Sequence, residues 1–177
     1  MKTIIALHGL PGSGKSEVRK ILVQEHGFFP LRVAKRLKEM LWALGCDDRH
    51  IEGVLKEEPC GLLGGVTPRR FMQTLGRELP DALGVPDLWG RLWAEEAQCL
   101  NAPRIVVEDH RYPNELSHFM SVGKTQVWQI NRPGFHGDNG AMQHQAEWQE
   151  NHWDQQVWNE GTLEDLKYNI AYRMQYV

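Results

Sequence analysis

The chain has 177 residues, 41% of them hydrophobic, which is enough to bury one sizeable core but hardly two. Its net charge of −3, from 20 basic and 23 acidic residues, argues against a protein that coats nucleic acid or binds anionic lipid. The three cysteines, Cys46, Cys60 and Cys99, lack metal-like spacing and indicate reduced thiols. No apolar run suits a membrane span or a signal peptide. We expect one cytoplasmic domain over residues 1–177.

Short β-branched segments alternate along the chain with longer helical patterns, which is typical of parallel βαβ units. Strands are predicted at residues 3–8, 28–33, 104–108 and 126–131, with a short fifth strand near Val157. Helices are predicted over residues 15–26 and 163–174, and further helices are expected to begin near Pro68, Pro86 and Pro113. The pattern favours an α/β fold with a parallel sheet.

Two segments differ from this alternation. Residues from about 34 to 102 form a long helical stretch between the second and third strands, which predicts a lobe beside the sheet. Residues from about 132 to 151 are rich in glycine and polar residues and predict a mobile surface flap. A metal site built from His136, His144 and His152 is the alternative for this region, but their spacing lacks the close pairs of zinc motifs.

The strongest chemical signal is GLPGSGKS, which fits G-x-x-x-x-G-K-S between a predicted strand and a predicted helix. The glycines allow backbone N–H groups to converge on phosphate oxygens, and the helix adds the positive end of its dipole. Lys15 would reach the β- and γ-phosphates, and Ser16 would place its hydroxyl on Mg²⁺. A glycine-rich turn that matches by chance is the alternative. The predicted ATP-binding residues are Gly9, Pro11, Gly12, Ser13, Gly14, Lys15 and Ser16.

A second signal, IVVEDHRYPNE, begins in the predicted strand at residues 104–108. Parallel sheets bind ligands at the carboxyl edge of their strands, where Asp109 would lie. Its carboxylate can hold Mg²⁺ or the water shell of the ion, and Arg111 can reach a phosphate. Taken alone, Asp109 and Glu108 could equally be a strand-end cap and a solvated charge. The phosphate-binding motif upstream favours the functional interpretation.

A third signal is the string TPRRFMQTLGRE, which puts Arg69, Arg70 and Arg77 on or near one predicted helix. A guanidinium group pairs bidentately with phosphate oxygens, so the cluster suits a phosphate-bearing acceptor. A solvated basic face is the alternative, and spacing alone favours it. Trp89 and Trp93 also allow two interpretations, because a base can stack on one of them, whereas their spacing favours core packing.

The order of these strings resembles one known family. The strings GLPGSGKS, VAKRLKEML, TPRRFMQTLGRE, VVEDHRYPNE, INRP, HQAE and WNEGTLEDL span nearly the whole chain and look like the deoxynucleoside monophosphate kinases of tailed bacteriophages. Only the first string is generic. The resemblance implies a three-layer αβα P-loop NTPase fold with a five-stranded parallel sheet of order 2-3-1-4-5, as in the adenylate- and guanylate-kinase-like enzymes. It also implies that the lobe at about 34–102 binds a monophosphate and that the flap is a short lid.

The resemblance further implies a reaction: the γ-phosphoryl group of ATP is transferred to the 5′-phosphate of a deoxynucleoside monophosphate (dNMP), with Mg²⁺ as the cofactor. Carried over by position, the catalytic residues are Lys15, Asp109, Arg111 and Arg132. Ser16 and Asp109 would hold the metal. The dNMP-binding residues would be Lys38, Arg69, Arg70, Gln73, Trp89 and Glu115. His144 and Glu147 match a family string and would anchor the flap.

Two positions depart from the family pattern, since Arg77 stands where threonine is common and Asp81 where an arginine often follows. Part of the acceptor site is therefore expected to differ. Another small-molecule kinase, acting on a sugar, shikimate or dephospho-coenzyme A, is the nearest alternative. A P-loop ATPase or switch is a further one, although the chain has no Asn-Lys-x-Asp guanine motif. We expect no polymeric nucleic acid and no membrane as partner, whereas the accepted base, the sugar selectivity and a homodimer are left open. If the chain is phage-encoded, the cytoplasm in which we expect it is that of the host cell.

Overall fold

The computed structural model describes residues 1–110, 112–134 and 153–177. The chain forms two compact units, and the second unit is an insertion between two segments of the first. Unit 1 holds Met1–Arg32 and Trp93–Val177, and unit 2 holds Val33–Leu92. The lobe predicted at about 34–102 thus overlaps unit 2, whose last residue is Leu92. Residues 135–151 of the predicted flap lie outside the described residues.

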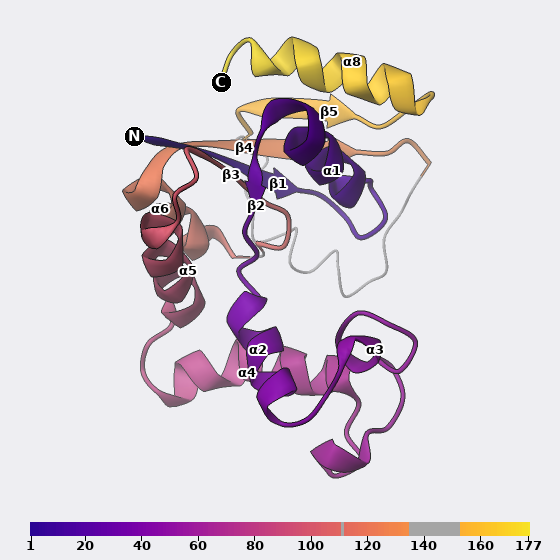
Figure 1. Cartoon of the computed structure of the whole chain (residues 1–177), viewed down its shortest axis with the longest axis vertical. Helices are drawn as coiled ribbons and strands as arrows, with labels where there is room; N and C mark the ends of the chain where they lie inside the picture. The colour runs from indigo at the N-terminus through magenta and orange to yellow at the C-terminus, as the bar shows by residue number, and fades with distance from the viewer. Residues whose placement is uncertain (111, 135–152) are drawn as a thin grey trace. The chain divides into compact units, whose positions relative to one another are not determined.

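Unit 1 is built on a five-stranded parallel sheet in the order β2-β3-β1-β4-β5 (Figure 1). This order confirms the predicted α/β fold. The strands are β1 (Lys2–His8), β2 (Phe29–Pro30), β3 (Arg104–Val107), β4 (Gly123–Asn131) and β5 (Gln155–Trp158). Because β1 lies between β3 and β4 and all strands are parallel, the carboxyl ends of these three strands meet at one edge of the sheet.

Two strands differ in length from their prediction. The strand expected at residues 28–33 pairs only Phe29 and Pro30 with β3, and Pro30 has no N–H to donate, which an edge strand tolerates. The strand expected from residue 126 begins earlier, at Gly123. A Cβ at this glycine would lie 2.1 Å from the carbonyl oxygen of Lys2, so glycine permits the close approach that extends the β1–β4 pairing.

Helices cover both faces of the sheet. Helices α1 (Lys15–His26) and α8 (Leu163–Met174) pack against each other and against one face of the sheet. The bounds of both helices agree with those predicted from the sequence. On the other face, α6 (Pro113–Val122) packs on β4, and Phe119 of α6 contacts Trp93 of α5 (Leu88–Cys99). None of the helices in the described ranges combines the length and apolar character that crossing a membrane requires.

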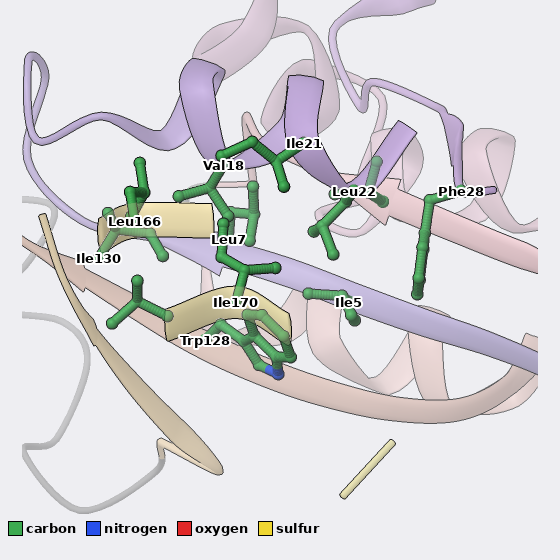
Figure 2. Close-up of a cluster of buried hydrophobic side chains, with 12 residues drawn as sticks. Ile5, Leu7, Val18, Ile21, Leu22, Phe28, Trp128, Ile130, Leu166 and Ile170 are labelled. Atoms are coloured by element: carbon green, nitrogen blue, oxygen red, sulfur yellow. The ribbon is translucent and has the colours of Figure 1, made fainter. Parts of the chain in front are cut away.

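Side-chain alternation along β1 divides the core between these two faces. Ile5 and Leu7 point into a buried cluster that α1 and α8 cover, together with Trp128 and Ile130 of β4 (Figure 2). The intervening positions face the other layer, where the ring of His8 lies near aromatic and histidine side chains. The cluster fixes α1, and therefore the loop that precedes it, against the central strand.

Unit 2 is helical and has a small core of its own. Its elements are α2 (Lys35–Ala43), α3 (Asp48–Ile51), a 3₁₀ turn (Gly61–Leu63), α4 (Pro68–Ala82) and the first residues of α5. Helix α4 contacts both α2 and α3. It begins as predicted, because Pro68 takes the first helical position and the Thr67 hydroxyl accepts from the N–H of Arg70 at 3.2 Å. The core residues are Leu41, Cys46, Ile51 and Cys60.

Replacing Ile170 by alanine should lower the free energy of unfolding by about 2 to 5 kcal/mol, because this fully buried side chain anchors α8 and its loss leaves a cavity. Tyr168→Ala on the same helix is the matched control, since Tyr168 is 76% exposed. Urea unfolding of both variants measures the difference. Equal effects of the two substitutions would contradict the anchoring role of Ile170.

Candidate active site

The loop between β1 and α1 adopts backbone conformations that favour glycine. Gly9, Gly12 and Gly14 have φ values of 146°, 83° and 106°. A Cβ on Gly9 would lie 2.5 Å from the carbonyl oxygen of Ile130 at the end of β4, and one on Gly14 would lie 2.2 Å from Nδ2 of Asn159. The loop is therefore packed closely against its neighbours, and it leads directly into the amino end of α1, a preferred position for anions.

Three side chains hold this loop by its carbonyl groups. Lys15, the first residue of α1, folds back and donates from Nζ to the carbonyl oxygens of Gly9 at 2.6 Å and Leu10 at 2.9 Å. Asn159 donates to the carbonyl of Ser13 at 2.9 Å, and Arg132 donates to that of Gly12 at 3.3 Å. Because these side chains bind carbonyl oxygens, they do not use the N–H groups, which are the donors that a polyphosphate requires.

Glu108 follows β3 directly and connects three segments of unit 1. Its Oε1 accepts from Nε and Nη2 of Arg32 at 2.9 and 2.6 Å and lies 3.0 Å from Nε of Arg19 on α1. Burial alone would raise the pKa of Glu108, but the bonds and charge of Arg32, the charge of Arg19 and the hydroxyl of Ser16 lower this pKa overall. Glu108 is therefore a buried, ionised partner of two arginines and not the solvated charge that the sequence allowed.

Asp109 and Ser16 supply oxygen atoms at the edge where the strands end. Asp109 is partly exposed beyond β3, and Ser16 is exposed in the first turn of α1. A carboxylate and a hydroxyl are the hard ligands that Mg²⁺ prefers, so these residues fit that ion. The part of the chain that the structure describes contains no group of three His, Cys, Asp or Glu residues that could hold a metal ion. Arg111 lies outside the described residues, as do His136, His144, Glu147 and His152.

Two buried histidines border the loop. His8 ends β1, and its ring centroid lies 5.6 Å from that of His110 and 4.6 Å from that of Trp153, which stacks on it. Burial and the charge of Lys15 lower the pKa of His8 to about 4. Burial, His8 and Lys15 lower the pKa of His110 to about 3. Both rings are neutral at pH 7, so they add no positive charge that would repel Lys15.

In unit 2, two of the predicted acceptor residues form ion pairs. Lys38 on α2 donates from Nζ to the carboxylate of Glu52, and Arg69 in the first turn of α4 donates from Nε to that of Glu57. Both basic residues therefore have an acidic partner from the segment around residues 52–57. These carboxylates could not be identified from the sequence, because nothing in a short Glu-rich segment distinguishes an ion-pair partner from a solvated charge.

The other predicted acceptor residues lie in different surroundings. Arg70 and Gln73 are exposed on α4. Trp89 is buried, and its Nε1 donates to the carbonyl of Gly76 at 2.9 Å. Of the two roles that the sequence allowed, this environment agrees with core packing and not with stacking on a base. Glu115 in unit 1 is buried in the first turn of α6, where its carboxylate accepts from the N-cap backbone N–H at 3.2 Å. Its observed contact is that of a capping box.

Comparison with protein-family models finds no match, and comparison with curated protein sequences finds none either. Among solved structures, the chain is similar to TT1252 from Thermus thermophilus, with 18% identity over 99% of this chain and 98% of that one and a TM-score of 0.56. It is also similar to a sugar kinase from Janibacter (12% identity, 99% and 95% coverage, TM-score 0.52). A third similar structure is the shikimate kinase of Aquifex aeolicus (15% identity, 98% and 96% coverage, TM-score 0.51). At these identities the similarity establishes the shared fold.

Gly9→Ala should weaken ATP binding by about tenfold to a hundredfold, because the loop would have to abandon its positive φ and its contact with Ile130. Gly61→Ala is the control, since a Cβ there meets nothing within 4 Å. Calorimetric titration with ATP gives both affinities, and circular dichroism checks that each variant is folded. An unchanged ATP affinity in Gly9→Ala would contradict the ATP-binding role that the sequence predicts for this loop.

The neutral histidines predict a loss of stability in weak acid. The pKa values of His8 and His110 are lower in the folded state than the ordinary value of 6.5, so the unfolded chain takes up more protons as the pH falls below 6.5. The free energy of unfolding should fall by about 2 to 3 kcal/mol between pH 7.5 and 5.5 from these two groups. Urea unfolding at several pH values measures the slope. His8→Asn and His110→Asn should each reduce it, and an unaltered slope in both would refute the assignment.

Proposed function

We propose that the chain is an ATP-dependent kinase that transfers the γ-phosphoryl group to a deoxynucleoside monophosphate, giving the diphosphate and ADP. The observation that carries this proposal is the glycine-built loop between β1 and α1, with Lys15 at its end and the carboxylates after β3 at the same edge of the sheet. The family resemblance of the strings at residues 67–78 and 106–115 supports a phosphate-bearing acceptor.

The donor site would use the loop amides and Lys15. Nζ of Lys15 donates to the carbonyls of Gly9 and Leu10, and ATP would offer it the stronger charge-assisted bonds of the β- and γ-phosphates. Ser16 and Asp109 would hold Mg²⁺, which when bound would neutralise charge on the phosphates. We assign to Arg132 the role of stabilising the negative charge of the transferred phosphoryl group, because its guanidinium donates to the loop at the carbonyl of Gly12. Arg111 is proposed to stabilise the same charge, because of its position in the family string.

The acceptor site would use the basic residues of unit 2. Among the predicted acceptor residues, Lys38 and Arg69 both pair with glutamates of one acidic segment, and a dianionic phosphate can take the place of such a carboxylate partner. Transfer needs no covalent intermediate. Catalysis would consist of holding two phosphates in line and stabilising the negative charge that redistributes in the transition state.

A second candidate is a P-loop kinase whose acceptor is not a nucleotide. The sugar kinase and the shikimate kinase among the similar structures share the fold, and the departures at Arg77 and Asp81 leave the acceptor site open to another substrate. A coupled assay of ADP release, run with the common dNMPs, ribonucleotides, shikimate, sugars and dephospho-coenzyme A, separates the candidates. The proposal expects stimulation by one or more dNMPs. Stimulation by a non-nucleotide acceptor alone would replace it, and acceptor-independent ATP hydrolysis would indicate an ATPase.

Lys15→Met should lower kcat/KM for ATP by about a hundredfold to a thousandfold, because it removes a cation placed where charge develops. Lys20→Met on the same helix provides the control, since Lys20 is exposed and pairs with Glu17 across one helical turn. Initial rates of ADP release compare both variants with the wild type. A Lys15 variant that is folded and retains normal turnover would exclude this residue from the reaction.

A further inference from the structure

Three basic residues of unit 2 converge although they come from separate segments. Lys38 lies on α2, Lys56 follows α3, and Arg69 lies in the first turn of α4. The N–H of Arg69 donates to the carbonyl of Lys56 at 3.0 Å, which fixes the two segments together. Burial lowers the pKa of Lys56, and the charges of Arg69 and Lys38 lower it further, against the opposing effect of Glu52 and Glu57. Lys56 was not identified in the sequence, where it is one lysine in a charged loop.

Two carboxylates neutralise these three cations. Glu52 is shared, because its Oε1 accepts from Lys38 while its Oε2 lies 3.8 Å from Nζ of Lys56. Glu57 binds Arg69. The side chains of Lys38 and Lys56 are 18% and 26% exposed, whereas that of Glu52 is 46% exposed. The lysines are thus set into the unit and the glutamate lies on the solvent side, so the carboxylate is the partner that can be displaced.

We propose that Lys56 is a third ligand for the phosphate of the acceptor, together with Lys38 and Arg69, and that Glu52 and Glu57 occupy the place of that phosphate until it binds. This inference rests on the proposed function and names a residue that the family resemblance does not supply. A phosphate monoester carries nearly two negative charges at pH 7 and presents three acceptor oxygens. One such dianion can replace the two carboxylates while giving each cation an oxygen of its own.

The arrangement has a consequence for specificity. An acceptor must compete with the carboxylates of Glu52 and Glu57, so it needs a negative charge close to that of the two carboxylates together. A phosphate dianion meets this condition, whereas a neutral hydroxyl compound does not. Removing Glu52 should therefore strengthen phosphate binding, and removing Lys56 should weaken it. A merely structural ion-pair network predicts that both substitutions weaken binding or lower stability.

The test measures KM for ATP and for the dNMP that the wild type phosphorylates best. Lys56→Met should raise KM for the dNMP about tenfold or more and leave KM for ATP unchanged, because one charge-assisted contact is lost. Lys56→Arg should restore most of the affinity. Glu52→Gln should lower KM for the dNMP several-fold. Lys35→Met is the matched control, since Lys35 lies on α2 and pairs with Glu39 across one helical turn, and it should change neither constant.

Titration with inorganic phosphate, followed by calorimetry, tests the site without turnover, and Lys56→Met should weaken the phosphate affinity of the wild type. Normal dNMP turnover with an unchanged dNMP KM in Lys56→Met would overturn this inference and leave the proposed function intact. Phosphate binding that depends on Lys56, without turnover of any dNMP, would support the site and overturn the proposed function. An increase in the dNMP KM of Glu52→Gln would show that Glu52 supports the site and does not occupy it.

Discussion

Under the proposed function, the amides of residues 9–16 would have to point at one anion, and this constraint would govern the surroundings of the loop. Amides that bind an anion leave the carbonyls of the loop to other donors, and the side chains of Lys15, Asn159 and Arg132 donate to these carbonyls. The same loop requires positive φ values and leaves no room for a Cβ at Gly9, which lies against the end of β4. The buried cluster under α1 and α8 then holds both ends of the loop (Figure 2). Sheet order, glycine positions and core packing thus together fix the conformation of the loop between β1 and α1.

In both units, neighbouring groups limit the repulsion between positively charged side chains. Near the loop, burial keeps His8 and His110 neutral beside Lys15, and Glu108 neutralises Arg32 and Arg19. In unit 2, the exposed Glu52 accompanies two more deeply buried lysines, and the exposed Glu57 pairs with the exposed Arg69. Basic side chains held close together repel one another unless a counter-charge is present, and carboxylates of the chain supply this counter-charge. Under the proposed function, phosphates would take over this role at both places.

The sequence predicted those features that depend on short segments. The successive β-branched residues from Ile105 to Val107 identified β3, and the motif at residues 9–16 identified the loop, because both signals are local. The predicted length of β2 was wrong, since its pairing with β3 ends at Pro30. A hydrophobic pattern does not take account of the N–H group that proline lacks. The partners of the site were missed for a different reason. Glu108 and Arg32 are 76 positions apart, and Asn159 and Ser13 are 146 apart, so only the fold brings them together.

Under the proposed function, the terminal phosphoryl group of ATP moves to a phosphorylated acceptor and not to water. Incubation of the wild-type chain with ATP radiolabelled at the γ-phosphate and an equimolar mixture of dNMPs, followed by chromatographic separation, measures this directly. The account predicts that the label appears in a deoxynucleoside diphosphate and that its appearance requires Mg²⁺. Label found solely as inorganic phosphate, with every dNMP recovered unchanged, would contradict it.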